Sequence, residues 1–311
     1  MNIAIETRGL TRRYKDTTAL DDVSLQIKAN TITGLRGRNG AGKTTFMSLA
    51  TAQDRPTSGE VFIEGQTPFE RAHVLERMCF LRDNQRYPDD YALKHALRAA
   101  RIFYPNWDQA YADELVRLFR IPRKTVVKKF SRGQFSALGI VLGLASRAPI
   151  TFFDEPYLGL DATARGYFYD ALLRDFQQHP RTIVLSTHLI DEVDRLLERV
   201  VILNAGRVVH DAEVEELRGA AHQVAGRASA VEAYCADRQV LSTHRVGGLA
   251  TAVIEGSVTP DDQRELALAD LELSPVSLQQ LVAAYGFDGE SIPDGELTAS
   301  QSEASMEGSR S

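Results

Sequence analysis

Residues 37–45 read Gly-Arg-Asn-Gly-Ala-Gly-Lys-Thr-Thr and match the pattern G-x-x-x-x-G-K-[ST]. An apolar run with strand character, residues 31–35, comes directly before them, and a helical pattern begins at Lys43. Glycines let such a loop turn tightly, so its backbone N–H groups and the following helix N-terminus can point at phosphate. The plain alternative is a glycine-rich turn with an incidental lysine, and a dinucleotide-binding loop has no role for the Lys-Thr pair. The full spacing between a strand and a helix favours a phosphate-binding loop.

The residue types within this loop indicate what each one does. Lys43 would reach the β- and γ-phosphates of a nucleoside triphosphate. The Thr44 hydroxyl would complete the shell of a Mg²⁺ ion that keeps several waters. The predicted nucleotide-binding residues of the loop are Gly37, Arg38, Asn39, Gly40, Ala41, Gly42, Lys43, Thr44 and Thr45.

A second stretch, residues 150–156, reads Ile-Thr-Phe-Phe-Asp-Glu-Pro. A buried apolar strand that ends in Asp154 places this carboxylate at the carboxyl edge of a sheet, where ligands bind in α/β folds. Asp154 would hold Mg²⁺ through water, and Glu155 would lie beside the γ-phosphate and polarise the attacking water. An aspartate that caps a helix is the structural alternative. The combination of Asp154 with the phosphate loop favours the functional interpretation, in which Asp154 holds Mg²⁺.

Strand and helix patterns alternate over the first two thirds of the chain. Short apolar runs at 150–153, 182–186 and 200–203 are each followed by a helical pattern, which is typical of a parallel sheet covered on both faces. Residues 69–147 read mainly as helix, and so do residues 212–220. The predicted fold class is α/β.

The pattern changes after residue 220, where short strands and short helices follow one another. Residues 221–286 predict a small α+β unit, with a ferredoxin-like arrangement as the suggested topology. Residues 287–311 are rich in Ser, Gly and acids, and we expect a disordered acidic tail. In the α+β unit the expected strands are 223–225, 249–255 and 271–273, and the expected helices are 228–236, 260–269 and 276–285.

Composition describes an ordinary globular chain of 311 residues, long enough for about two domains. The formal net charge is −6 and lies mostly in the acidic tail, so the body lacks the clustered basic excess of a nucleic-acid-binding protein. Two distant cysteines give no support for a disulfide framework, and no apolar run reaches the ~20 residues of a membrane span. The first residues also lack a signal-peptide pattern, so we expect a cytoplasmic chain.

The motifs resemble those of the nucleotide-binding subunit of an ABC (ATP-binding cassette) transporter, in the order that this family has, over roughly residues 3–217. Residues 130–134, Phe-Ser-Arg-Gly-Gln, are similar to the LSGGQ signature. Residues 158–161, Leu-Gly-Leu-Asp, resemble the D-loop, and His188 resembles the switch histidine after the next strand. Tyr14 matches the aromatic residue that stacks on adenine.

This resemblance implies a P-loop ABC cassette over residues 1–220, with a parallel-sheet core, an antiparallel β subdomain and a helical subdomain at about 86–147. It implies ATP and Mg²⁺ as cofactors, with Glu155 and His188 as the catalytic residues. Outside the loop, the implied nucleotide contacts are Tyr14, Ser131, Gly133, Gln134 and Asp161, and the implied metal contacts are Thr44, Asp154 and Gln85.

Several places depart from the family pattern. Arg38 stands in the loop where the family usually has Pro, and Ala137 stands where an Arg often follows the signature. Phe130 and Arg132 replace the Leu and the first Gly of the signature. At the Q-loop, strict spacing puts Asp83 where the family has Gln, whereas Gln85 has the expected chemistry two residues later. The sequence leaves open which of the two serves there.

The resemblance also implies partners. Two cassettes pair head to tail, here as an expected homodimer, and drive a separate membrane permease from the inner face of the cell membrane; no nucleic acid is expected. Export is the expected direction, by analogy with cassettes that carry a similar C-terminal extension. The aromatic segment 87–105 is a candidate docking surface, or else part of the core. The alternative is a soluble ABC ATPase that remodels ribosomal or nucleic-acid complexes, although such proteins generally carry two cassettes or a long coiled-coil insertion.

Overall fold

The computed structural model describes residues 2–187, 193 and 195–281. Their central element is a six-stranded sheet in which β9, at one edge, runs antiparallel and the other strands run parallel. In sheet order the strands are β5 (Met78–Leu81), β6 (Ile150–Asp154), β7 (Thr182–Ser186), β3 (Ile32–Arg36), β8 (Arg199–Asn204) and β9 (Arg207–Glu213). The predicted α/β class with a parallel core is confirmed.

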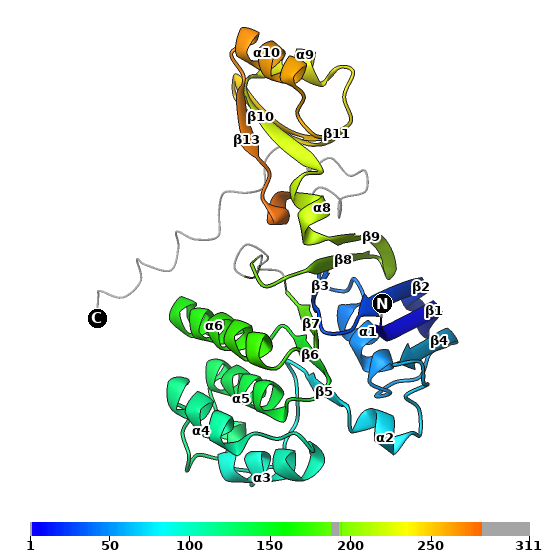
Figure 1. The fold of residues 1–311 in the computed structure, drawn as a ribbon, viewed down its shortest axis with the longest axis vertical. Helices are drawn as coiled ribbons and strands as arrows, with labels where there is room; N and C mark the ends of the chain where they lie inside the picture. The colour runs from blue at the N-terminus through cyan, green and yellow to red at the C-terminus, as the bar shows by residue number, and fades with distance from the viewer. Residues whose placement is uncertain (1, 188–192, 194, 282–311) are drawn as a thin grey trace, which may run out of the picture.

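Separate layers cover the two faces of this sheet (Figure 1). One layer consists of α3 (Leu93–Phe103), α4 (Gln109–Leu118), α5 (Arg132–Ser146) and α6 (Ala162–Gln178). The other contains α1 (Lys43–Ala50), the short α2 (Ala72–Leu75) and an antiparallel sheet of β2 (Thr17–Lys28), β1 (Ile3–Tyr14) and β4 (Ser58–Ile63). Among the described residues, no helix combines the length and the apolar character needed to cross a membrane.

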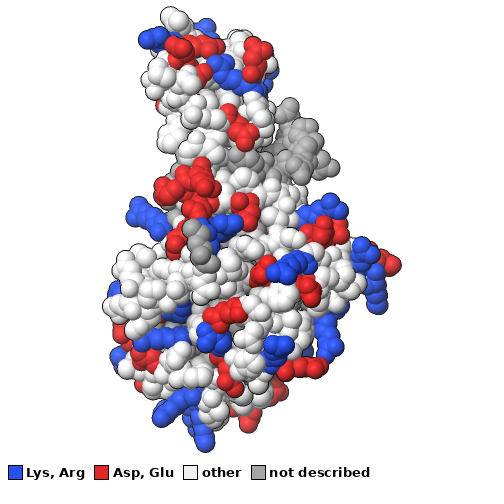
Figure 2. Space-filling model, turned by 45° about the vertical axis from the view of Figure 1, so that its right-hand side comes forward, with Lys and Arg blue, Asp and Glu red and all other residues white. Residues whose placement is uncertain are grey.

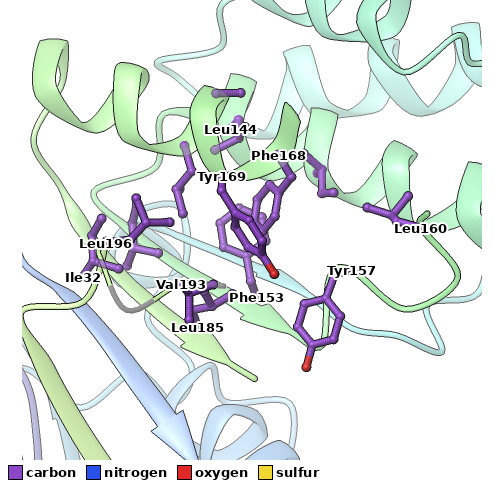
Figure 3. Close-up of a cluster of buried hydrophobic side chains, with 14 of the residues drawn as sticks. Ile32, Leu144, Phe153, Tyr157, Leu160, Phe168, Tyr169, Leu185, Val193 and Leu196 are labelled. Atoms are coloured by element: carbon purple, nitrogen blue, oxygen red, sulfur yellow. The ribbon is translucent and has the colours of Figure 1, made fainter. Parts of the chain in front are cut away.

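Along each central strand, alternate residues pack against the two layers. Phe153 and Leu185 belong to the core beneath α5 and α6 (Figure 3). Phe152 and Val184, their neighbours in sequence, belong to the core on the other face, with α1 and the three-stranded sheet. A strand that is buried on both faces needs apolar residues at every position, which explains the continuous apolar runs in the sequence.

The structure corrects two boundaries expected from the sequence. The stretch 69–147 contains β5, whose four residues are too few to interrupt a helical pattern. Residues 212 and 213 belong to β9, so the helix that follows, α8, is limited to Val214–Arg218. Most side chains of β9 are half-buried or exposed, and the strand therefore lacks the apolar alternation that marks a strand in a sequence.

The aromatic segment 87–105 divides into buried and exposed parts. The ring of Tyr87 packs edge-on against Phe135, with ring centroids 5.8 Å apart, and Tyr104 packs against the core of the helical layer. Ile102 and Phe103, at the end of α3, are 72% and 69% exposed. The segment therefore presents apolar surface at the end of α3, while two of its tyrosines belong to the interior.

Beyond α8 the chain forms a separate four-stranded antiparallel sheet in the order β11-β12-β10-β13 (Figure 1). The elements follow one another in the order βαββαβ, and both helices lie on one face of the sheet. Together with the strand order, this is the ferredoxin-like arrangement that the sequence suggested. β11 was not expected, because most of its side chains are exposed and carry no alternation. Residues 278–281 begin the helix expected at 276–285, and the remainder of it lies outside the described residues. The elements are β10 (Ala221–Arg227), α9 (Ala228–Cys235), β11 (Val240–Val246), β12 (Leu249–Glu255), α10 (Pro260–Leu268) and β13 (Glu272–Pro275).

A buried charge cluster fixes the end of α6 against the start of β7. The Asp175 carboxylate lies 2.7 Å from the guanidinium of Arg181, and both side chains are at most 4% exposed. Arg147, at the end of α5, approaches the same carboxylate at 3.5 Å and Asp108 at 3.1 Å. A buried ion pair adds little net stability, but removal of one partner leaves the other charge buried and uncompensated.

We therefore predict that Asp175→Ala lowers the free energy of unfolding by about 3–5 kcal/mol. Chemical denaturation followed by circular dichroism measures this change. The control is Asp89→Ala, which removes an exposed aspartate paired with Lys128 at 3.0 Å in the same layer and should change stability little. Equal losses in the two variants would contradict the prediction.

Candidate nucleotide-binding site

The phosphate loop connects the carboxyl end of β3 to the first turn of α1. Gly42 is the N-cap of α1 and has a left-handed φ of 104°, and a side chain there would meet the Ala19 carbonyl oxygen at 2.5 Å. Glycine is therefore required at this position by both conformation and space. The loop forms one wall of an open cavity of about 1170 Å³ at the carboxyl edge of the central sheet. The cavity is lined by every residue of the loop from Gly37 to Thr45 and, among others, by Tyr14, Asp83, Arg132, Asp154 and Glu155.

Lys43 is held inside its own loop. Its ammonium group donates hydrogen bonds to the carbonyl oxygens of Gly37 at 2.7 Å and Arg38 at 3.2 Å, and the residue is 7% exposed. Burial lowers the pKa of Lys43, and the nearby carboxylates of Glu155 and Asp154 oppose this shift. An anionic ligand in the cavity would give this cation a full counter-charge.

Three oxygen-bearing side chains meet where β6 and β7 end. The Thr44 hydroxyl donates to one oxygen of the Asp154 carboxylate at 2.6 Å, and the Ser186 hydroxyl donates to the other at 2.9 Å. A hydroxyl and a carboxylate are the donors that Mg²⁺ takes from a protein when it keeps its waters and binds phosphates. Within residues 2–187, 193 and 195–281, no three His, Cys, Asp or Glu side chains gather as a metal cage. The donor set fits a magnesium ion that shares its shell with a ligand.

Glu155 follows directly and has an unusual backbone conformation. Its φ is 49°, in the left-handed region that residues other than glycine seldom adopt. Its carboxylate accepts a hydrogen bond from the hydroxyl of Tyr157, whose ring is 2% exposed. In Figure 3 this hydroxyl points away from the apolar cluster beside it. Backbone strain of this kind is concentrated at functional sites, where surrounding contacts hold it.

Tyr14 lies on the cavity wall in a fixed orientation. Its hydroxyl donates to Asp54, and the guanidinium of Arg12 lies 4.4 Å from the centroid of its ring. Arg12 also pairs with Asp54 at 2.8 Å, so the three side chains support one another. Tyr14 is 41% exposed, which leaves apolar surface on which a flat base could stack.

Other predicted residues lie away from this cavity within the chain. Ser131 is the N-cap of α5 and forms a capping box with Gln134, and Asp161 is the N-cap of α6. None of these three lines the cavity, and neither does Gly133. His188 lies outside the described residues.

Of the two Q-loop candidates, Asp83 lines the cavity. Gln85 instead lines a small adjoining pocket beside Asp154 and Glu155.

Several residues that line the cavity were not predicted from the sequence. Thr17 and Ala19 on β2 and Asn204 at the end of β8 come from elements without a motif. A polar residue at the end of an apolar strand is the signal that could have identified Asn204. The hydrogen bond from Tyr157 to Glu155 had no signal at all.

Comparison with known proteins agrees with this geometry. A family model described as ABC transporter matches residues 20–158. The ABC transporter ATP-binding protein YtrB of Bacillus subtilis is 28% identical over 214 residues, which cover 69% of this chain and 73% of the relative. The daunorubicin resistance ATP-binding protein DrrA3 of Streptomyces coeruleorubidus is 30% identical over 228 residues, which cover 69% of this chain and 70% of the relative.

Solved structures show the same fold. An ATP binding subunit of an ABC transporter has a TM-score of 0.62 at 25% identity, and the match covers 69% of this chain and 92% of that chain. A dimeric bacterial ABC transporter cassette has a TM-score of 0.60 at 23% identity, over 68% of this chain and 98% of that chain. The chain thus belongs to the family of ABC transporter ATP-binding proteins, which are ATPases.

Proposed function

We propose that the cavity binds ATP with Mg²⁺ and that this chain hydrolyses ATP to drive a separate membrane permease. The observation that carries the proposal is the convergence of Lys43, the Thr44–Asp154 pair and Glu155 on one cavity behind a phosphate loop. A solved cassette of the same fold is described as a post-hydrolysis state with bound ADP and Pi.

Each side chain has a distinct task in the proposed reaction. Lys43 exchanges its carbonyl partners for the β- and γ-phosphates, and Tyr14 stacks on the base. Thr44 and Asp154 hold Mg²⁺, which when bound neutralises charge on the phosphate oxygens. Glu155 accepts a proton from the attacking water, and His188 contacts the γ-phosphate.

The signature residues act on the nucleotide of a second cassette. Ser131, Gly133, Gln134 and Asp161 do not line the cavity of their own chain, which agrees with a site completed by a partner. Ser131 stands at the N-terminus of a 15-residue helix, where N–H groups and the helix dipole favour an anion. ATP would close the head-to-tail dimer, and hydrolysis would open it.

The names of the relatives support a permease partner and transport by export. DrrA3 is named for daunorubicin resistance, and BcrA of Bacillus licheniformis, 28% identical, is named for bacitracin transport. By analogy with these relatives, we propose that this chain drives export at the inner face of the cell membrane. The exposed end of α3, with Ile102 and Phe103, is the proposed docking surface for the permease. A soluble remodelling ATPase is less favoured, because basic and acidic residues are interspersed over the face shown in Figure 2.

We predict that Lys43→Ala and Glu155→Gln separate binding from hydrolysis. Lys43→Ala removes the full positive charge that is expected at the β- and γ-phosphates and should abolish tight ATP binding. Glu155→Gln keeps the shape of the site and should retain ATP while turnover falls by at least about 100-fold. Calorimetric titration of ATP and a phosphate-release assay measure the two effects. Hydrolysis by Glu155→Gln at the wild-type rate would remove the general-base assignment.

We further predict that complementary defects rescue one site in a mixed dimer, provided that the chain pairs with itself. One copy carries Lys43→Ala, the other carries Ser131→Arg, and both carry Glu155→Gln. In the mixed dimer one site bears both lesions and the other joins an intact loop to an intact signature. Differently tagged copies are co-purified, and the retained ATP is counted per dimer.

About one ATP should be retained per mixed dimer and essentially none by either homodimer. If mixing rescued nothing, the head-to-tail arrangement of two identical cassettes would be excluded. The reference is the dimer in which both copies carry Glu155→Gln and no other change. It should retain ATP in both sites.

A third prediction concerns the boundary proposed at residue 220. Among the described residues, Asn204 is the last one along the chain that lines the cavity, so a chain that ends at residue 220 should bind ATP with nearly unchanged affinity. It should be less stable to heat, because Val214 and Leu217 of α8 share a core with Val253 and Leu278. The midpoint of thermal unfolding measures the stability, and the shift of that midpoint on addition of ATP measures the binding. A folded truncated chain that fails to bind ATP would contradict the boundary.

A further inference from the structure

Asp83 and Arg132, where the sequence departs from the family pattern, meet in space. The Arg132 guanidinium donates a hydrogen bond to the Asp83 carboxylate at 3.3 Å, across 49 positions in the sequence. Both side chains line the cavity that also contains Lys43 and Thr44. Asp83 follows β5, and Arg132 is the first residue of α5.

The stem of Arg132 packs against the loop before α6. A side chain at Gly159 would lie within 2.9 Å of the Arg132 Cβ and Cγ atoms, and a side chain at Gly133 would meet the Gly159 carbonyl oxygen at 2.4 Å. The start of α5 and the loop before α6 therefore touch through glycines, and the capping box of Ser131 fixes the first turn. From this fixed base the guanidinium reaches across to Asp83.

A carboxylate on the wall of a phosphate cavity raises an electrostatic problem. Asp83 is 37% exposed and faces the same cavity as Asp154 and Glu155, so it adds a third negative charge around a polyanionic ligand. Lys43 donates its hydrogen bonds to carbonyl groups of its own loop, whereas the Asp83 carboxylate accepts a hydrogen bond from Arg132. A guanidinium beside the carboxylate removes most of its field at the ligand.

We infer that Arg132 is a positioning residue for the nucleotide site of its own chain: it pairs with Asp83, holds this carboxylate at the cavity wall and cancels its repulsion of the triphosphate. The inference rests on the proposed binding of ATP. The two departures from the family pattern then compensate each other. The pair is partly exposed, with 62% of the Arg132 side chain accessible, so its effect is modest and sensitive to salt.

The test is a double-mutant cycle on the ATP affinity of the purified full-length chain. Arg132→Gln should weaken ATP binding roughly two- to fivefold, because it leaves the Asp83 carboxylate unpaired. In the Arg132→Gln, Asp83→Asn double variant the affinity should return to within about twofold of the wild-type value, since the repelling charge is gone. Arg132→Lys, which keeps a positive charge, should recover part of the loss. The loss should be smaller for ADP than for ATP, and smaller at high ionic strength.

The matched control is the exposed pair of Lys128 and Asp89, 3.0 Å apart in the same layer and outside the cavity lining. Lys128→Gln, with or without Asp89→Asn, should leave the ATP affinity unchanged. Unchanged affinity in Arg132→Gln, or a loss that Asp83→Asn fails to recover, would overturn the inference while ATP binding by the wild type stands. Failure of the wild-type chain to bind ATP would instead overturn the proposed function, and the inference with it.

Discussion

The hydrogen bonds on the Asp154 carboxylate join three parts of the chain that are far apart in sequence. Thr44 donates to it from the first turn of α1, after β3, and Ser186 donates from the end of β7, while Asp154 itself ends β6. β7 lies between β3 and β6 in the sheet, so this contact forms only when the strands are in that order and register. The phosphate loop and Glu155 then lie at one edge because parallel strands end together there.

Sequence reasoning recovered the parts of this arrangement that local pattern encodes. The loop at 37–45 follows β3, the stretch 150–156 begins with β6, and each motif is one continuous piece of sequence. Both strands are buried on both faces, so apolar runs identify them. β5, β11 and the end of β9 were missed or misread because short or exposed strands lack that pattern. The ferredoxin-like topology was suggested by the order of elements, although one of its four strands was not seen.

Contacts between distant segments could not be predicted in the same way. Arg132 was recognised as a departure from the signature, but its partner Asp83 is brought to it by the packing of β5 against α5. The hydroxyl of Tyr157 reaches Glu155 through a backbone with a left-handed φ, which no residue pattern announces.

The solved cassette that is matched over 92% of its length covers 69% of this chain, so the rest of the chain has no counterpart in that structure. The α+β unit beyond α8 is packed onto the cassette through Val253 and Leu278 rather than attached as an isolated appendage.

The central claim is that a triphosphate takes the place of the loop carbonyls around the Lys43 ammonium. Burial lowers the pKa of Lys43, and a bound polyanion would raise it again, so ATP binding must take up protons at alkaline pH. Calorimetric titration of ATP in two alkaline buffers of different ionisation enthalpy measures this uptake. We predict a proton uptake that grows as the pH rises toward the ordinary pKa of lysine and that is absent from any residual binding by Lys43→Ala. Tight ATP binding whose heat does not depend on the buffer would contradict the account.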